Sequence, residues 1–344
     1  MLQSPPLLSA GLALSAAGFV SRGLSEVDGV NISRVMGHLQ SSGLALLRTA
    51  LAQGHKDETL LATCLIWCLA EVFAGRQEIC SWRIHLQGIK ALLEDHQEYR
   101  FTTSSPTSTQ SAMRHLILLY RSLQTLPYLP TIPLPDSSSQ VIKAATTGPH
   151  RALAVGATID GFLGYSEELL DLLQEINETP QSAQEANHVL VKLLGMIDRD
   201  AQAPPGVSIS SSLSPQSGRD FALCHRIFQH ASLVQLYRQL YKLPSCSQQI
   251  QDAVEAIQGM INNMTQGQPC NTWVAMAMPL FTIGCEAFRD DQKAFVLDKI
   301  HKFGVCLGSL HVQIIRRALE DVWRIRADHR DMDGELCAAH LLGK

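Results

Sequence analysis

Cysteine and histidine side chains are considered first, because their spacing decides whether a chain can hold a transition metal. The nine cysteines never form a C-x2-C pair, whereas a two-zinc cluster needs six closely spaced thiolates that begin with such a pair. Cys64 and Cys68 lie one helical turn apart inside an apolar run, which favours core packing. His85 and His115 have no evident partner in the sequence and are interpreted as hydrogen-bonded structural residues. The sequence therefore predicts no metal and no cofactor.

Carboxylates and nucleophiles are the next candidates for chemistry. Asp290 and Asp291 supply two of the carboxylates that a terpene cyclase uses to hold magnesium, but no second acidic motif follows. We interpret the pair as the acidic first turn of a helix. The chain has no G-x-S-x-G, no phosphate-binding glycine loop and no H-E-x-x-H. These observations predict that the protein is not an enzyme.

The charge pattern bears on partners. The formal net charge is −4, and a phosphate-binding surface would need a one-signed basic patch. The arginine-rich stretch at 316–330 is interspersed with acidic residues, which is typical of a solvated helical face. We expect no direct sequence-specific DNA contact from this chain. Scattered cysteines of odd number indicate a reducing compartment, nucleus or cytosol.

Residues 5–20 form an uncharged apolar run at the start of the chain. No lysine or arginine precedes it, as a secretory signal would require, and it is too short and too rich in Ser, Ala and Gly for a membrane span. We expect a buried first helix and no membrane association. A cryptic secretion signal is the alternative.

Apolar residues recur mostly at three- and four-residue steps, which predicts helices. A helix is expected over 63–73 with flanking Leu60 and Leu61, capped by Asp57 and ended by Gly75, and a second helix is expected over 78–94. Ser166 should cap the next helix, and Thr179 with Pro180 should open another. Asp28-Gly29 lacks alternating flanks and is not expected to form a hairpin. The predicted fold is all-α, an irregular multi-helix bundle with several long polar loops.

Three polar segments interrupt the helices, near residues 102–111, 127–150 and 201–218. Their Ser, Thr, Pro and Gly content predicts mobile surface loops. Helices flank all three, so we expect residues 1–344 to form a single helical domain.

Three stretches of the chain carry a family pattern. Residues 58–93 contain a W-x-x-H-L-x-G segment, residues 159–176 contain L-G-x-S-x-x-L-L, and residues 273–324 contain MPLFTIGCEAF followed by V-W-R. They resemble, in order, the fungal-specific transcription factor domain that follows zinc binuclear clusters. The signature positions, which the resemblance implies to be fold-defining groups, are Glu71, Gly75, Trp82, His85, Gly88, Gly164, Trp273, Glu286 and Trp323.

The resemblance implies a transcriptional regulator of a filamentous fungus, located in the nucleus or the cytoplasm, in the setting of nutrient use or secondary metabolism. The family's zinc cluster normally precedes this domain, and here the chain begins almost at the domain's first helix. Either the DNA-binding part has been lost or the sequence begins late. Function is then expected through a protein partner or a homodimer, or through a small-molecule effector.

Two alternatives remain beside this interpretation. Trp273, Met276, Met278 and Phe281 could line a small-molecule pocket between helices, although core packing is preferred. Such a protein would be an effector-binding or accessory protein of a biosynthetic cluster. An all-α enzyme of the cluster would instead need polar groups that converge in a cleft with shifted pKa values.

Overall fold

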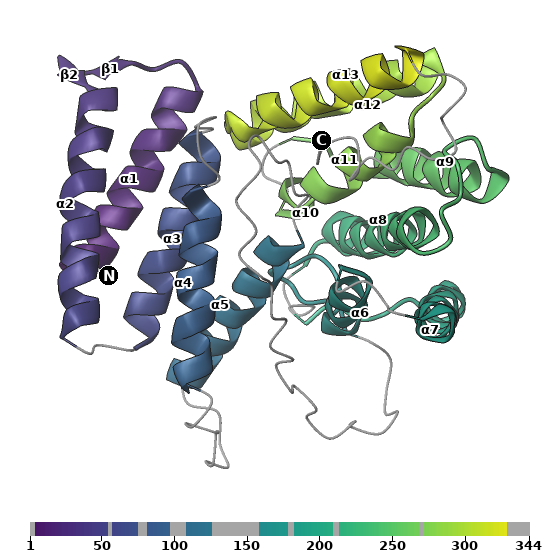
Figure 1. Ribbon diagram of the computed structural model, residues 1–344, viewed down its shortest axis with the longest axis horizontal. Helices are drawn as coiled ribbons and strands as arrows, with labels where there is room; N and C mark the ends of the chain where they lie inside the picture. The colour runs from purple at the N-terminus through teal and green to yellow at the C-terminus, as the bar shows by residue number, and fades with distance from the viewer. Residues whose placement is uncertain are drawn as a thin grey trace. The chain divides into compact units, whose positions relative to one another are not determined.

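The computed structural model describes residues 4–53, 57–74, 81–96, 108–125, 158–177, 182–208, 213–267 and 271–328. These residues form thirteen α-helices and one two-stranded hairpin, so the predicted all-α class is confirmed (Figure 1). The elements are α1 (Pro5–Ser21), β1 (Glu26–Val27), β2 (Val30–Asn31), α2 (Ile32–Ala52), α3 (Glu58–Ala74), α4 (Ser81–His96), α5 (Ser108–Gln124), α6 (Glu167–Asn177), α7 (Ala183–Gln202), α8 (Pro215–Gln239), α9 (Gln248–Asn263), α10 (Asn271–Val274), α11 (Ala277–Glu286), α12 (Asp290–Leu307) and α13 (His311–Asp328).

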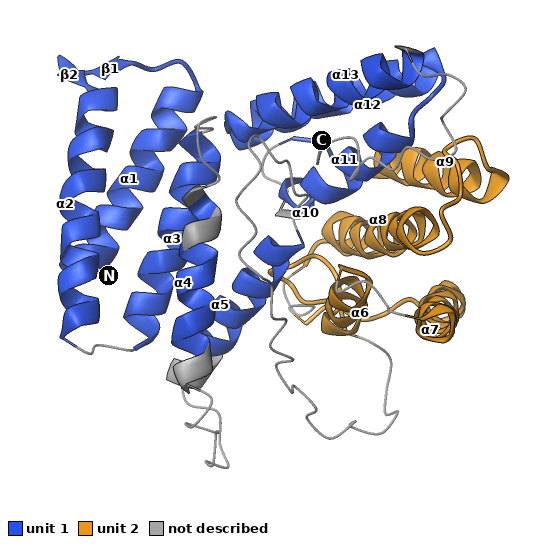
Figure 2. Ribbon diagram, viewed as in Figure 1, with its two compact units in different colours: residues 1–127, 265–330 blue, residues 128–264, 331–344 orange. Residues whose placement is uncertain are grey.

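The chain divides into two units, which Figure 2 colours separately. Unit 1 combines residues 1–127 with residues 265–330, and unit 2 consists of residues 128–264 with residues 331–344. Unit 1 is therefore discontinuous in sequence, and most of unit 2 lies between its two segments. This division does not decide whether either unit folds alone, so the expected single domain stays a prediction.

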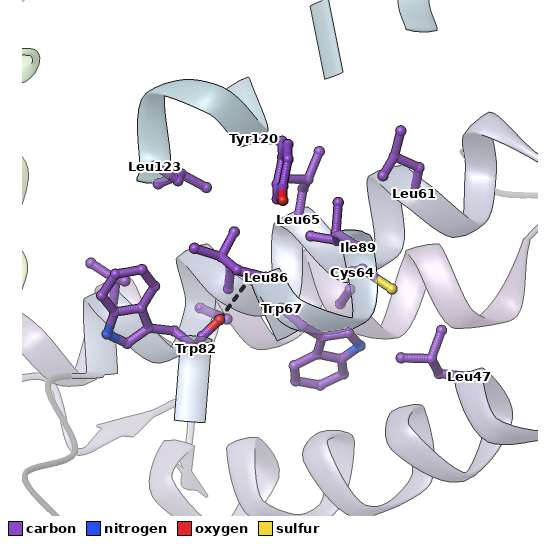
Figure 3. Packing of buried hydrophobic residues seen from close by; sticks show 14 of the residues in the cluster. Leu47, Leu61, Cys64, Leu65, Trp67, Trp82, Leu86, Ile89, Tyr120 and Leu123 are labelled. Carbon is purple, nitrogen blue, oxygen red and sulfur yellow. Dashed lines mark hydrogen bonds between the residues drawn. The ribbon is translucent and has the colours of Figure 1, made fainter. Parts of the chain in front are cut away.

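Helix α3 lies at the centre of unit 1. Its buried residues include Leu60, Leu61, Cys64, Leu65, Trp67 and Cys68, which face in nearly all directions around the helix axis. A helix that is apolar all round must be covered on every side, and α3 contacts α1, α2, α4, α5 and α13. Figure 3 shows Trp67 of α3 with Trp82, Leu86 and Ile89 of α4 and Tyr120 of α5 in this cluster.

The C-terminal segment of unit 1 returns to α3 through the turn between α12 and α13. Gly308 ends α12 with a φ of 61°, a left-handed conformation that glycine accepts at low cost. Ser309 Oγ then donates to the Val72 carbonyl at 3.2 Å, and the Leu310 N–H donates to the Phe73 carbonyl at 3.1 Å. The turn thereby satisfies carbonyls at the C-terminal end of α3 that the helix itself leaves free.

Unit 2 is organised around α8. This helix contacts α6, α7 and α9, and Phe221, Cys224, Ile227 and Phe228 are among its buried residues. Ahead of α6, the backbone of Ile159 pairs with Gly206 and Ser208, at 2.8 Å and 2.9 Å. Segments 158–166 and 203–208 are thus fixed beside the helices.

Most predicted helix starts are confirmed. Asp57 Oδ1 accepts from the Leu60 N–H at 2.9 Å, Ser166 Oγ accepts from the Leu169 N–H at 3.2 Å, and Asp290 opens α12. The predicted start of α7 was wrong, because Ser182 caps this helix by accepting from the Glu185 N–H. Thr179, Pro180 and Gly75 lie outside the described residues.

Two of the segments expected as loops contain helix. Helix α5 begins at Ser108, and α8 begins at Pro215 after its N-cap Ser214. Proline fits the first helical position because its missing N–H has no partner there. Residues 127–150 lie outside the described residues.

The Asp28-Gly29 pair does form a hairpin turn, contrary to the sequence expectation. Asp28 has a φ of 50° and Gly29 a φ of 78°, as a type I′ turn requires at both central positions. The strands they join, β1 and β2, have two residues each. Strands this short show no alternation, so the turn dipeptide was the only signal available.

Within the described residues, no helix combines the length and the apolar character needed to cross a bilayer. The run at 5–20 forms α1, whose buried residues are Leu7, Ala10, Ala13, Ala16 and Ala17.

Replacing Gly43 should destabilise unit 1, because a Cβ there would lie 2.5 Å from Trp67 Cζ2 and 3.0 Å from Ser9 Cβ. We expect Gly43→Ala to lower the free energy of unfolding by about 1–3 kcal/mol through overpacking. Gly37→Ala is the matched control in the same helix, since a Cβ there meets nothing within 4 Å. The control should be neutral or stabilising by up to about 1 kcal/mol. Urea denaturation followed by circular dichroism measures both, and equal stability of the two variants would contradict the packing argument.

Candidate functional site

A buried polar cluster lies between α6, α7 and α8 of unit 2. Asp200 from α7 is 3% exposed, and His225 and Gln229 from α8 are completely buried. The two α8 residues are one turn apart and therefore face the same side of the helix. Such side chains are costly to bury unless their polar atoms are paired.

The hydrogen bonds of His225 fix its tautomer. The backbone N–H of Ser166 donates to His225 Nδ1 at 3.3 Å, so Nδ1 carries the lone pair. The proton is then on Nε2, which donates to Asp200 Oδ2 at 2.9 Å. Gln229 Nε2 donates to the same carboxylate oxygen at 2.7 Å. The imidazole is neutral, and both of its nitrogens are occupied.

Arg199 connects the cluster to the surface. Its Nε donates to Asp200 Oδ1 at 2.8 Å, and its two terminal nitrogens donate to the Glu168 carboxylate at 3.2 Å and 2.9 Å. The Arg199 and Glu168 side chains are 37% and 50% exposed, so their bidentate pair lies at the solvent edge. The guanidinium thus joins the first turn of α6 to the end of α7.

The surroundings shift the pKa values of both central groups. Burial of Asp200 on its own would raise its carboxyl pKa, but the hydrogen bonds from Arg199 and His225 outweigh burial and hold the pKa below its ordinary value. Burial lowers the pKa of His225, and this effect exceeds the opposing attraction of the Asp200 carboxylate. The cluster is therefore an ionised Asp–Arg pair beside a neutral histidine.

A carboxylate paired with an imidazole can serve as a general base when the other ring nitrogen faces a reactant. Here that nitrogen, Nδ1 of His225, accepts from a backbone N–H. The hydroxyl oxygen of Ser166 is already hydrogen-bonded, because Ser166 Oγ caps α6. The geometry supports a structural link in which one buried cluster holds the start of α6, the end of α7 and the middle of α8.

Asp200, His225 and Gln229 were not predicted from the sequence, although a signal was present. The buried side of α7 follows three- and four-residue steps through Ala186, Val189, Leu193 and Met196 and ends on Asp200. A carboxylate on an apolar stripe predicts a buried partner on a neighbouring helix. The stripe does not identify that partner, because His225 is 25 residues further along the chain.

The first group of signature residues lies on α3 and α4. His85 Nε2 is 3.3 Å from Glu71 Oε1, a partner that the sequence did not reveal. Trp82 is buried, and its carbonyl accepts from the Cys68 thiol at 3.3 Å. Gly88 is exposed and has open space where a Cβ would lie, so packing does not explain it. Gly75 lies outside the described residues.

A second group surrounds the C-terminal end of α11. Trp323 Nε1 of α13 donates to the Gly284 carbonyl at 2.8 Å. Arg326 Nη1, also from α13, donates to the Cys285 carbonyl, and its Nη2 lies 3.9 Å from Glu286 Oε2. These side chains satisfy carbonyls that the end of a helix leaves free.

The remaining signature residues are in two further places. Gly164 has a φ of 84° in the turn before α6, where a left-handed backbone favours glycine. Trp273 is buried and packs edge-to-face on Phe303 with ring centroids 6.2 Å apart. The fold-defining role of the whole set stays a prediction.

The two cysteines considered for metal binding and the four residues considered for a ligand pocket are buried. Burial raises the pKa of the Cys64 thiol to about 11 and raises that of Cys68 as well, which leaves both thiols protonated and poorly suited to bind a metal. Among the described residues, no three or more His, Cys, Asp or Glu side chains are grouped so that they could hold a metal ion. All four residues that could line a ligand pocket occupy core positions instead. They are Trp273, Met276, Met278 and Phe281.

Comparison with known families gives one result. Residues 1–333 match the model described as the fungal specific transcription factor domain. No curated protein and no solved structure matches the chain.

Removing the charge of Asp200 should destabilise unit 2. Asp200→Asn loses the charge-assisted bonds to Arg199 and His225, and we expect the free energy of unfolding to fall by about 3 kcal/mol. Asp198→Asn is the matched control, since Asp198 lies on the exposed side of the same helix and surface changes there should stay within about 0.5 kcal/mol. Chemical denaturation of both variants checks this, and a neutral Asp200→Asn would show that the buried cluster contributes little.

Stability should also fall on acidification, because the pKa of His225 is lower in the folded chain than its ordinary value of about 6.5. Below that pH the unfolded chain binds a proton that the folded chain excludes, so the free energy of unfolding decreases as pH falls toward the folded pKa. His225→Gln should flatten this decrease between pH 7 and pH 5. The exposed His188 provides the control, and His188→Gln should keep the wild-type slope. If denaturation midpoints across this range show the same slope in all three proteins, the histidine does not contribute.

Proposed function

The chain belongs to the fungal specific transcription factor domain family, and from this membership we propose that it regulates transcription in a filamentous fungus through its helical regulatory domain. The observation that carries the proposal is the extent of the family match, which covers residues 1–333 of 344. We further propose a nuclear location and target genes in a metabolic or secondary-metabolite cluster.

We propose that the protein acts through protein contacts, by a partner or by homodimerisation, rather than by reading DNA itself. The densest arginine stretch supports this, because two of its arginines pair with carboxylates of α13 and a third is buried. Arg316 pairs with Glu320 at 2.8 Å, Arg324 pairs with Asp321, and Arg326 is buried. Phosphate binding requires cationic side chains that are free to displace counterions. A small-molecule effector that modulates the protein contacts belongs to the same proposal.

A tethering experiment tests the proposed function. The whole chain is fused to a heterologous DNA-binding domain that recognises sites upstream of a reporter gene in a filamentous fungus. We expect reporter output to rise or fall relative to the DNA-binding domain alone, and a fluorescent fusion to accumulate in the nucleus.

The destabilised Gly43→Ala variant, fused in the same way, should lose the effect, while Gly37→Ala should keep it. Reporter output that is unchanged by the folded wild-type fusion, together with exclusion from the nucleus, would contradict the proposal.

A further inference from the structure

Helix α1 has an outward side that its neighbours do not cover. The helix packs on α2 and α3, and Figure 1 shows it between these two helices. Leu12 and Phe19 are seven residues apart and therefore on the same side of α1, and they are 48% and 41% exposed. The buried side of the helix consists of Leu7, Ala10, Ala13, Ala16 and Ala17.

The outward residues of α1 follow the spacing of a helix–helix seam. Alternating steps of three and four residues separate Pro5, Leu8, Leu12, Ser15 and Phe19, as they separate the a and d positions of a heptad. Leu8 is half-buried and the other four are exposed. A second helix packed alongside α1 would cover all five, because they share one side. These five residues are called the α1 seam below.

Burying the α1 seam would not strand a polar or charged group. Helix α1 contains no charged residue. The Ser15 hydroxyl donates to the Gly11 carbonyl of the same helix at 3.0 Å, so it is already paired. The first charge after the helix is Arg22, whose Nε lies 2.8 Å from the position that a Cβ on Gly308 would occupy. That charge is therefore held beside the turn between α12 and α13.

The outward sides of α12 and α13 differ from the α1 seam. On α12, Asp298 pairs with Lys302 at 2.9 Å, and on α13, Arg316 pairs with Glu320 at 2.8 Å. Charged pairs one turn apart are typical of a helix side that faces water. A row of apolar side chains without such pairs is instead typical of an interaction site.

The α1 seam is self-complementary in size when two copies run antiparallel. If Leu12 lies opposite Leu12 of a second copy, the sequence places Phe19 opposite Pro5 and Leu8 beside Ser15. Large residues then face small ones, which fills space without overlap. Charges that flank a helix seam normally select its partner, and α1 has none that would repel its own copy or attract a charged helix.

We propose that the α1 seam binds the α1 seam of a second copy of this chain, as an antiparallel helix pair with its two-fold axis near Leu12. One helix side from each copy makes a small contact, so the dimer is reversible. The inference rests on the proposed function, in which homodimerisation is one of two routes, and deepens it by assigning the surface.

Self-association of the full chain tests the surface. Light scattering between about 1 and 100 μM should show a mass that rises from the monomer toward twice that value. Leu12→Ser/Phe19→Ser should raise the dissociation constant of the dimer at least about tenfold. Both side chains are exposed, so circular dichroism should show unchanged folding. Val305→Ser is the control, since it changes a 71% exposed apolar residue of α12 and should associate as wild type.

Disulfide trapping tests the antiparallel arrangement. With diamide as the oxidant, Leu12→Cys should form a disulfide-linked dimer, because the two introduced thiols face each other across the axis. Phe19→Cys should not, since its two copies lie about 21 Å apart along the helices, whereas a disulfide needs Cα atoms within roughly 7 Å. The wild-type chain gives the background from its own exposed Cys246.

Several outcomes would overturn the proposal. A monomer at every concentration, or a dimer that Leu12→Ser/Phe19→Ser leaves intact, removes the α1 seam as the contact. Trapping of Phe19→Cys as efficiently as Leu12→Cys contradicts the antiparallel pair. Binding to phosphatidylcholine vesicles that the double variant abolishes, without self-association, assigns the seam to membranes. A monomer that is active in the reporter assay leaves the proposed function standing without this inference, and a dimer that is inert there does the reverse.

Discussion

Burial of α3 is the constraint on which the arrangement of unit 1 depends. Its apolar side chains face nearly all directions around the helix axis. Exposing any side of α3 to water would therefore lose part of the hydrophobic free energy that stabilises the fold. Helices α1, α2, α4 and α5 cover it from the N-terminal part of the chain, and α13 contacts it from the C-terminal part. The turn at 308–310 adds hydrogen bonds to the last carbonyls of α3. The burial of α3 thus requires both segments of unit 1, which are separated in the sequence by almost all of unit 2.

Unit 2 uses a different kind of interaction to fix its helices. Apolar packing around α8 brings the helices together, but the hydrophobic effect has no preferred direction. The bonds that the Asp200 carboxylate accepts from His225 and Gln229 of α8 are directional, so they hold at one alignment of α7 with α8. The same bonds occupy the atoms that an acid–base catalyst would need to keep free. The shifted pKa values of Asp200 and His225 therefore arise from burial and from the bonds that hold the helices together.

The sequence predicted what local patterns determine. Helix class follows from three- and four-residue spacing, and Asp57, Ser166 and Asp290 act at the helix starts where their side-chain chemistry places them. The prediction from the sequence failed at the start of α7, where two capping residues lie close together. Ser182 caps this helix, three residues after the expected Thr179. The pairs Asp200–His225 and Glu71–His85 were out of reach, because each joins separate helices whose alignment depends on tertiary packing.

The arginines that the structure describes differ in what balances their charge. Arg326 and Arg238 donate from buried positions to the carbonyls of Cys285 and Leu243, so they are part of the fold. Arg316 is exposed but pairs with a carboxylate on its own helix. Arg34 and Arg48 of α2 are exposed, and their side chains pair with no other residue that the structure describes. A buried arginine must have a hydrogen-bonded partner, whereas an exposed arginine is stabilised by water, so only the buried arginines of this set are needed by the fold.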